Sequence, residues 1–227
     1  SAARSSGAVK TELYSSDTTT GWPGLTFAFR YSTTRASAGV VLVAMGLARA
    51  VKNPGGAPLV ICVTNGWLLD ERRYDSLLAA GVGLFSISLD FPDDRHDGFR
   101  RIPGLYAKLD ALVPRLAGRG LGNIALNTAL TRANFAEIPA LVANAERWGV
   151  KISFSAYSAL RTGNREYCIE SAEDLALLAR HFDFLRGEHA RTGTVLNTPW
   201  ILEHTLRFFR NGGHLGSSLG AVEIVVA

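Results

Sequence analysis

The sequence predicts an α/β protein with a parallel β-sheet. Short apolar runs typical of buried strands alternate with longer segments whose apolar residues have helical spacing. The predicted strands are separated by more than the roughly dozen residues that a parallel connection needs. Of the 227 residues, 47% are hydrophobic, so the chain can bury one substantial core. We therefore expect consecutive βα units in a single domain.

The first two clear units lie between residues 59 and 117. The apolar run 59–63 predicts a fully buried strand, and the spacing in 69–81 predicts a helix that stops at Gly81. A second strand is expected over 84–90. A second helix is expected over 101–117, where the apolar spacing is again helical.

The same alternation continues toward the C-terminus. A third strand is predicted at 123–130, a helix at 134–149 that Gly149 ends, and a fourth strand at 150–157. Ser171, followed three residues later by Asp174, is typical of the start of a helix. The remaining expected elements are a helix over 171–189, a helix over 199–210 that begins at Pro199, and a strand over 221–227.

The composition and the N-terminal part limit the classes of function. The net charge is +4, but the basic residues are scattered, so we expect no nucleic-acid partner. The apolar segment 36–48 ends at Arg49 and is shorter than the roughly 20 residues that span a bilayer. We expect no membrane association, a cytoplasmic protein, and a poorly ordered Ser- and Thr-rich leader over 1–24.

Polar residues lie toward the carboxyl ends of the four predicted strands between residues 59 and 157. In parallel α/β folds, ligands bind at the carboxyl ends of strands, so these residues are candidates for a site, although polar strand ends also cap the helices that follow. They are Thr64, Asn65, Ser88, Asp90, Asn127, Thr128, Ser155 and Tyr157.

Four ordered pieces of sequence carry a resemblance to a known family. "TNG" follows the strand at 59–63, "SLDFPDDRHDGFR" follows with a later "GLY", "NTALTRANFAEIPALVANAERWGV" comes next, and "GHLGSSLGAVEIVV" lies near the C-terminus. In this order and spacing the chain resembles the radical S-adenosylmethionine superfamily from about residue 59 onward. The resemblance implies a partial (β/α)6 TIM-like barrel over 25–227, with an N-terminal portion that is incomplete or irregular.

The resemblance also implies cofactors and site residues. Members of the family hold a [4Fe-4S] cluster on a CxxxCxxC loop, and its open iron binds S-adenosylmethionine for reductive cleavage to an adenosyl radical. By motif position, the cofactor-facing groups here are Thr64, Asn65, Ser88, Asp90 and Asn127, and Arg100 is a candidate for the cofactor's carboxylate. Tyr157, Arg161 and Arg165 are candidates for contact with a substrate, a small molecule or peptide whose identity is unknown.

The chain departs from the family at its cluster loop. It contains two cysteines, Cys62 and Cys168, so three thiolate ligands cannot be supplied. The cysteine spacing would fall on Ser32, Ala36 and Gly39. The family's Gly-Gly-Glu segment is also missing, because no Asp or Glu occurs from residue 18 to 69. We therefore expect no radical chemistry from the chain as given.

Three hypotheses about function remain open from the sequence. The chain is a radical S-adenosylmethionine enzyme whose cluster loop was lost by truncation, engineering or sequence error, or a catalytically dead barrel that binds an adenosyl compound or a protein partner. A cofactor-free lyase or aldolase ranks third, because no lysine lies convincingly at a strand end. The spacing of the acidic segment 90–97 fits neither an EF-hand nor a histidine-pair zinc site, and the segment is interpreted as a solvated loop.

Overall fold

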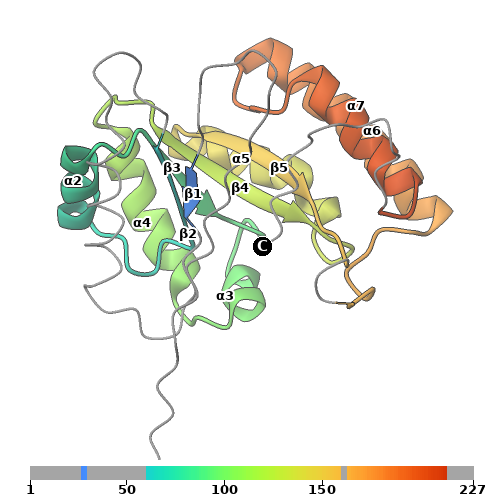
Figure 1. Ribbon diagram of the computed structural model, residues 1–227, viewed down its shortest axis with the longest axis horizontal. Coiled ribbons are helices and arrows are strands. Elements are labelled where there is room, and N and C mark those ends of the chain that lie inside the picture. Colours follow the sequence, from blue (N-terminus) through green and yellow to red (C-terminus); the bar gives the residue numbers. More distant parts are fainter. Residues whose placement is uncertain (1–26, 30–59, 160–162, 214–227) are drawn as a thin grey trace, which may run out of the picture.

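The computed structural model describes residues 27–29, 60–159 and 163–213 (Figure 1). The predicted leader at 1–24 and the predicted strand at 221–227 lie outside these residues. So do the positions Ser32, Ala36 and Gly39, where the cluster loop of the family would fall.

The described residues form an α/β fold on a parallel sheet, which confirms the predicted class. Its strands lie in chain order, and each is parallel to the next. They are β1 (Phe27–Phe29), β2 (Val60–Thr64), β3 (Leu84–Ser88), β4 (Ile124–Leu130) and β5 (Lys151–Ala156).

A short sixth segment continues the sheet beyond β5. Val195 pairs with Ile152 in parallel as an isolated bridge. The backbone N–H of Ile152 donates to the Thr194 carbonyl at 2.9 Å, and the Leu196 N–H donates to the Ile152 carbonyl at 2.8 Å. The chain therefore adds a further parallel segment to the edge of β5 after one more helix.

Helices follow the strands, as predicted, with differences around residue 100. The predicted helix at 101–117 begins later, because Arg101 is left-handed (φ 56°) and Gly104 also has positive φ. A short helix that was not predicted precedes this turn. The helices are α2 (Glu71–Ala80), α3 (Arg95–Arg100), α4 (Leu105–Ala117), α5 (Ile138–Trp148, preceded by the 3-10 turn Phe135–Glu137), α6 (Ala172–Thr192) and α7 (Pro199–Arg210).

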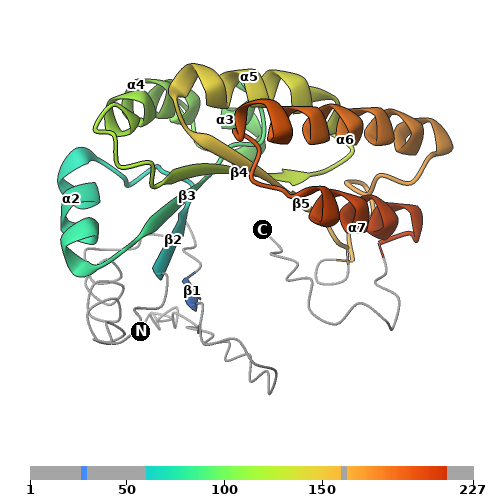
Figure 2. The ribbon, with the colours of Figure 1, turned by 90° about the horizontal axis from the view of Figure 1, so that it is seen from above.

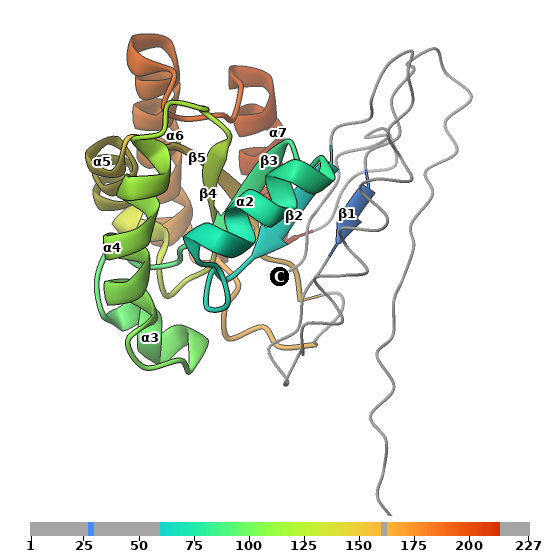
Figure 3. The same cartoon turned by 90° about the vertical axis from the view of Figure 1, so that its left-hand side faces the viewer.

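The sheet curls, and the long helices follow one another around its outer side (Figure 2). Viewed from the side of α2, the helices α4, α5 and α6 lie together on one side of the strands (Figure 3). Helix α7 packs against α6 and β5. This arrangement leaves the inner face of the sheet without a covering helix among the described elements.

The hydrophobic core lies between the sheet and these outer helices. In β3, Phe85 and Ile87 are fully buried, whereas the alternate residues Ser86 and Ser88 are partly exposed. The alternation follows from the two-residue period of a strand, which sends successive side chains to opposite faces. Fully burying a side chain such as Ile87 stabilises the fold by about 1.5–3 kcal/mol. Among the described residues, no helix combines the length and the apolar character needed to cross a membrane.

Candidate functional site

Three polar side chains form a row across the inner face of the sheet. The register pairs Ser88 of β3 with Asn127 of β4, and Asn127 with Ser153 of β5. Paired residues of adjacent strands point to the same face, so the three side chains lie side by side. The Ser153 hydroxyl donates a hydrogen bond to Asn127 Oδ1 at 3.2 Å. We call Ser88, Asn127 and Ser153 the polar row.

The polar row faces away from the core. Its sheet neighbours Ile87, Leu126 and Ile152 are fully buried on the helix side, whereas the side chains of the row are half-buried. The row therefore offers two hydroxyls and an amide on a face that no described helix covers. Such groups bind the hydroxyl, amine and carboxylate groups of a small polar ligand.

Thr64 and Asn65, at the end of β2, serve mainly the turn that follows them. Thr64 Oγ1 accepts from the Gly66 N–H at 3.0 Å, and Asn65 Oδ1 accepts from the Trp67 N–H at 3.0 Å. Thr64 pairs in register with the core residue Ile87 rather than with Ser88. The structure therefore leaves Thr64 out of the polar row, and both side chains make the short-range bonds typical of polar turns.

Asp90 and Arg100 meet just beyond β3. Asp90 is fully buried, and its Oδ2 accepts a hydrogen bond from Arg100 Nε at 2.5 Å. Burial raises the pKa of the Asp90 carboxyl, while the charge and the hydrogen bond of Arg100 act in the opposite direction. The two predicted cofactor residues thus bind each other directly.

His96 completes this buried group. Its Nδ1 accepts from the Asp90 backbone N–H at 3.2 Å, and its side chain is fully buried. Desolvation, followed by the charge of Arg100, lowers the pKa of His96 to about 4. The prediction that 90–97 is a solvated loop is therefore wrong for Asp90 and His96, which the loop folds inward.

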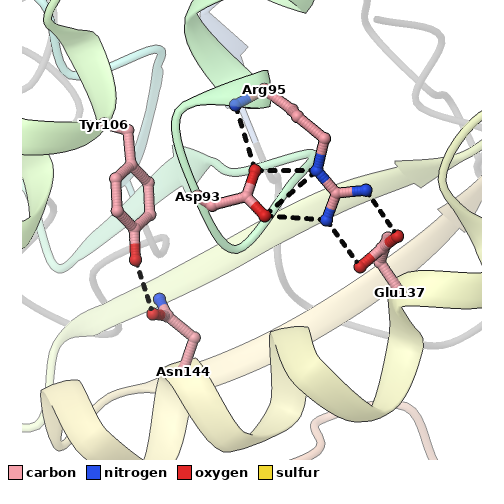
Figure 4. Close-up of polar contacts among 5 residues, drawn as sticks. All are labelled: Asp93, Arg95, Tyr106, Glu137 and Asn144. Carbon is pink, nitrogen blue, oxygen red and sulfur yellow. Dashed lines mark hydrogen bonds and ion pairs between the residues drawn. The ribbon is translucent and has the colours of Figure 1, made fainter.

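Two further acidic residues of this loop, Asp93 and Asp97, have structural partners. The Arg95 guanidinium bridges Asp93 and Glu137, with closest distances of 2.7 Å to each carboxylate (Figure 4). Asp97 accepts the backbone N–H groups of Gly104 at 2.6 Å and Tyr106 at 2.7 Å, so it fixes the start of α4. Within the described ranges, no three His, Cys, Asp or Glu residues gather as a metal site would require.

Helices α4 and α5 are joined next to this loop by polar side chains. The Tyr106 hydroxyl donates to Asn144 Oδ1 at 3.1 Å (Figure 4). Arg147 donates to Asp110 at 2.8 Å, and the indole N–H of Trp148 donates to the same carboxylate oxygen at 2.8 Å. These bonds join the outer helices α4 and α5 to each other. Their side chains do not contribute to the inner face of the sheet, where the polar row lies.

Two of the three candidate substrate residues line one cavity. A cavity of about 160 Å³ lies between the loop after β5 and the end of α7, and Tyr157, Arg165, Cys168 and Phe209 are among its lining residues. Arg165 is paired with Glu170 there. Arg161, the third candidate, lies outside the described residues.

The two cysteines do not suit an iron–sulfur cluster. Cys62 lies in β2, and burial raises the pKa of its thiol to about 11, so the thiolate that binds iron is disfavoured. Cys168 lies in the loop before α6, and burial raises the pKa of its thiol as well. Two thiols also fall short of the three cysteines that the family resemblance requires. The residues present do not fit this cofactor.

Comparison of the whole chain with protein-family models and with curated proteins gives no match.

Sequence reasoning did not select Ser153 and His96. A signal for Ser153 was present, because Ser153 and Ser155 alternate with the apolar Ile152 and Phe154 in the pattern of a half-buried strand. For His96 the sequence offers no signal, since its burial depends on how the loop after β3 folds back.

Proposed function

We propose that the chain is a partial (β/α)6 barrel of the radical S-adenosylmethionine type that binds an adenosyl compound on its inner face. Strands in unbroken chain order, with the helices along the outer side of a curled sheet, are typical of barrels, whereas doubly wound sheets reverse their strand order. The segment at Val195 supplies a sixth parallel position. The proposal includes a cytoplasmic location.

The polar row is the observation that carries the proposal. S-adenosylmethionine has two ribose hydroxyls, an adenine edge, and an amino-acid moiety, all of which need hydrogen-bond partners in a site. Ser88 and Asn127 are two of the residues that the family resemblance assigns to the cofactor, and the register pairs Ser88, the last residue of β3, with Asn127, the fourth of the seven residues of β4. The hydroxyl of Ser88 has no hydrogen-bond partner among the described residues and is available to a ligand.

The proposed activity is the binding of an adenosyl compound. Radical chemistry is the reaction class of the family that the chain resembles. The cysteines do not fit a cluster, so no reductive cleavage of S-adenosylmethionine is derived from this chain. The ligand would be S-adenosylmethionine or S-adenosylhomocysteine, and the substrate of any associated reaction is not specified by the site. A barrel that instead binds a protein partner is the alternative that the experiment below separates.

Isothermal titration calorimetry with S-adenosylmethionine and S-adenosylhomocysteine tests the proposal. Ser88→Ala and Asn127→Ala should each weaken binding by a factor of about 2 to 13, which corresponds to the loss of one hydrogen bond of about 0.5–1.5 kcal/mol. Ser86→Ala is the matched control, because Ser86 lies on the same face of β3, one row further from the carboxyl end. If neither ligand releases heat with the unmodified chain, adenosyl binding is refuted and the protein-partner alternative remains.

A second measurement addresses the cluster. After anaerobic reconstitution with iron and sulfide, we expect no absorbance in the charge-transfer region of a [4Fe-4S] cluster and no cleavage of S-adenosylmethionine. A reconstituted cluster would contradict the conclusion drawn from Cys62 and Cys168.

A further inference from the structure

The guanidinium of Arg100 is held at one nitrogen only. Its Nε donates to Asp90 Oδ2, while its two terminal Nη atoms have no hydrogen-bond partner among the described residues. The Arg100 side chain is 23% exposed, whereas Asp90 is 0% exposed. The buried carboxylate therefore fixes the guanidinium at Nε, and neither Nη group is used by a described residue. A fork of two Nη groups matches the two oxygens of a carboxylate.

The backbone around this pair is held in one conformation. At the start of the loop, His96 Nδ1 accepts a hydrogen bond from the backbone N–H of Asp90. At its end, the Asp97 carboxylate accepts from the backbone N–H of Gly104, just before α4. Arg101, which follows Arg100, is the one non-glycine residue with positive φ in the described part of the chain. Strained positions of this kind persist where the surrounding structure enforces them, and they cluster at functional sites.

The buried group is not optimised for stability. Asp90 Oδ1 and His96 Nε2 are both buried without a hydrogen-bond partner in the described structure. Unsatisfied buried polar atoms cost free energy, and a buried ion pair contributes little net stability compared with apolar residues of the same shape. A role in orienting Arg100 accounts for keeping a carboxylate at this position.

The pair lies next to the polar row. Asp90 follows Ser88 by two residues, and the Leu89 N–H donates to the Asn127 carbonyl at 3.0 Å, which keeps the chain beside β4 as it leaves the strand. Asp90, and with it the Arg100 Nε that its carboxylate holds, therefore lies just beyond the carboxyl end of β3, where Ser88 ends the strand.

We propose that Asp90 is a positioning residue that aims the Nη groups of Arg100 at a carboxylate of the ligand, and that it makes no ligand contact itself. This inference rests on the proposed function, in which the ligand is an adenosyl compound. It assigns specificity: the site prefers adenosyl compounds that carry an amino-acid carboxylate over those that lack one. The expectation that Asp90 contacts the cofactor is replaced by an indirect role.

The test compares S-adenosylhomocysteine with 5′-methylthioadenosine, which has the same nucleoside and no carboxylate. We expect Asp90→Leu and Arg100→Met each to weaken S-adenosylhomocysteine binding about tenfold or more, and to change 5′-methylthioadenosine binding less than twofold. The double variant should bind S-adenosylhomocysteine no more weakly than Arg100→Met alone, because both substitutions remove the same contact with the ligand. Asp90→Asn keeps a side-chain oxygen that accepts a hydrogen bond from Arg100 Nε. Compared with Asp90→Leu, it should recover part of the preference for S-adenosylhomocysteine over 5′-methylthioadenosine.

Three outcomes overturn the inference while adenosyl binding stands. These are an unchanged S-adenosylhomocysteine affinity in Asp90→Leu, an equal loss for both ligands, which indicates a general structural role, and full additivity in the double variant. Thermal unfolding of each variant confirms that the protein used is folded.

A separate probe applies if the unmodified chain binds no adenosyl compound, so that the proposed function fails. NMR of the Arg100 side-chain N–H resonances with millimolar L-methionine then tests the fork directly. A shift in the unmodified chain that disappears in Asp90→Leu supports the positioning role without the nucleoside. No shift in the unmodified chain refutes it.

Discussion

The side chain of Asn197 binds the backbone of Phe154 on both sides. Asn197 Oδ1 accepts the Phe154 N–H at 2.7 Å, and Asn197 Nδ2 donates to the Phe154 carbonyl at 2.8 Å. Both bonds are buried. The Asn197 amide thus replaces the backbone of a neighbouring strand. It pairs the N–H and the carbonyl of Phe154 at the edge of β5, where the short segment at Val195 ends.

Replacing Asn197 with Leu should destabilise the fold by about 2–4 kcal/mol. The change leaves a buried N–H and a buried carbonyl of Phe154 unpaired, and each costs about 1–3 kcal/mol, partly offset by the added apolar side chain. Urea unfolding followed by circular dichroism measures the difference. Asn211→Ala, at the exposed end of α7, is the control and should change stability by less than about 0.5 kcal/mol. A similar small effect for both variants would contradict the role given to Asn197.

A substitution of Gly66 by Ala should destabilise the fold by about 1–3 kcal/mol. Gly66 has φ 79°, and a Cβ atom there would lie 2.5 Å from Leu109 Cδ2. Gly98 in α3 is the matched control, because its φ is ordinary and a Cβ atom there meets nothing within 4 Å. Gly98→Ala should instead stabilise by about 0.5–1 kcal/mol. Relative to the unmodified chain, the midpoint temperature of thermal unfolding should therefore fall for Gly66→Ala and rise for Gly98→Ala.

Removing Arg100 alone should cost more stability than removing it together with Asp90. Arg100→Met leaves a buried carboxylate without its partner, for which losses of about 3–5 kcal/mol are typical. In the double variant Asp90→Leu with Arg100→Met no charge is left behind, and the loss should be smaller. Equilibrium unfolding at neutral pH compares the two. Equal losses would show that Asp90 does not depend on Arg100.

Acid should destabilise the chain partly through His96. Its pKa of about 4 in the folded state lies below the ordinary value of 6.5, so the unfolded chain binds the proton more tightly. The stability that this contributes is full above about pH 6.5 and falls by up to about 3 kcal/mol as the pH drops toward 4. Asp90, Asp97 and Arg100 surround the ring, so only the difference between the parent and a variant isolates it.

His96→Asn is the variant for this measurement, because its side-chain oxygen can accept from the Asp90 N–H in place of Nδ1. We expect its unfolding free energy to vary less between pH 7 and pH 4 than that of the parent chain. Parallel pH profiles for the two proteins would rule out His96 as a contributor to acid sensitivity.

The strands from β2 to β5 were predictable because each is an apolar run bounded by polar or turn residues, whereas β1 (Phe27–Phe29) was not predicted. The predicted strand at 84–90 overlaps β3 (Leu84–Ser88), and the N-cap expected at Ser171 is present, with the Ser171 hydroxyl accepting from the Asp174 N–H at 3.0 Å. The start of α4 was predicted four residues too early. Pro103 and Gly104 form a dipeptide typical of turns, and apolar spacing alone passed over it.

The candidate site was only partly predictable, because its geometry depends on register and loop conformation. Ser88 and Asn127 were selected from their positions at strand ends, and the register places them side by side. A single sequence does not fix the register between β2 and β3. In the structure this register pairs Thr64 with Ile87, which lies on the core side of the sheet. Likewise, Arg100 lies ten positions after Asp90, at the end of the short helix α3, and only the folded loop brings the two residues into contact.

The spacing from Asp90 to Asp97 is under a length constraint. Asp90 determines where Arg100 lies, and Asp97 in the same loop determines where α4 begins. One residue inserted between them would displace α3 relative to one anchor or the other, and an insertion within the helix would turn the residues after it by about 100°. Amino-acid replacements at exposed positions such as Asp94 should be tolerated there, whereas insertions and deletions should not. Natural variation in this loop is therefore expected in residue identity and not in residue number.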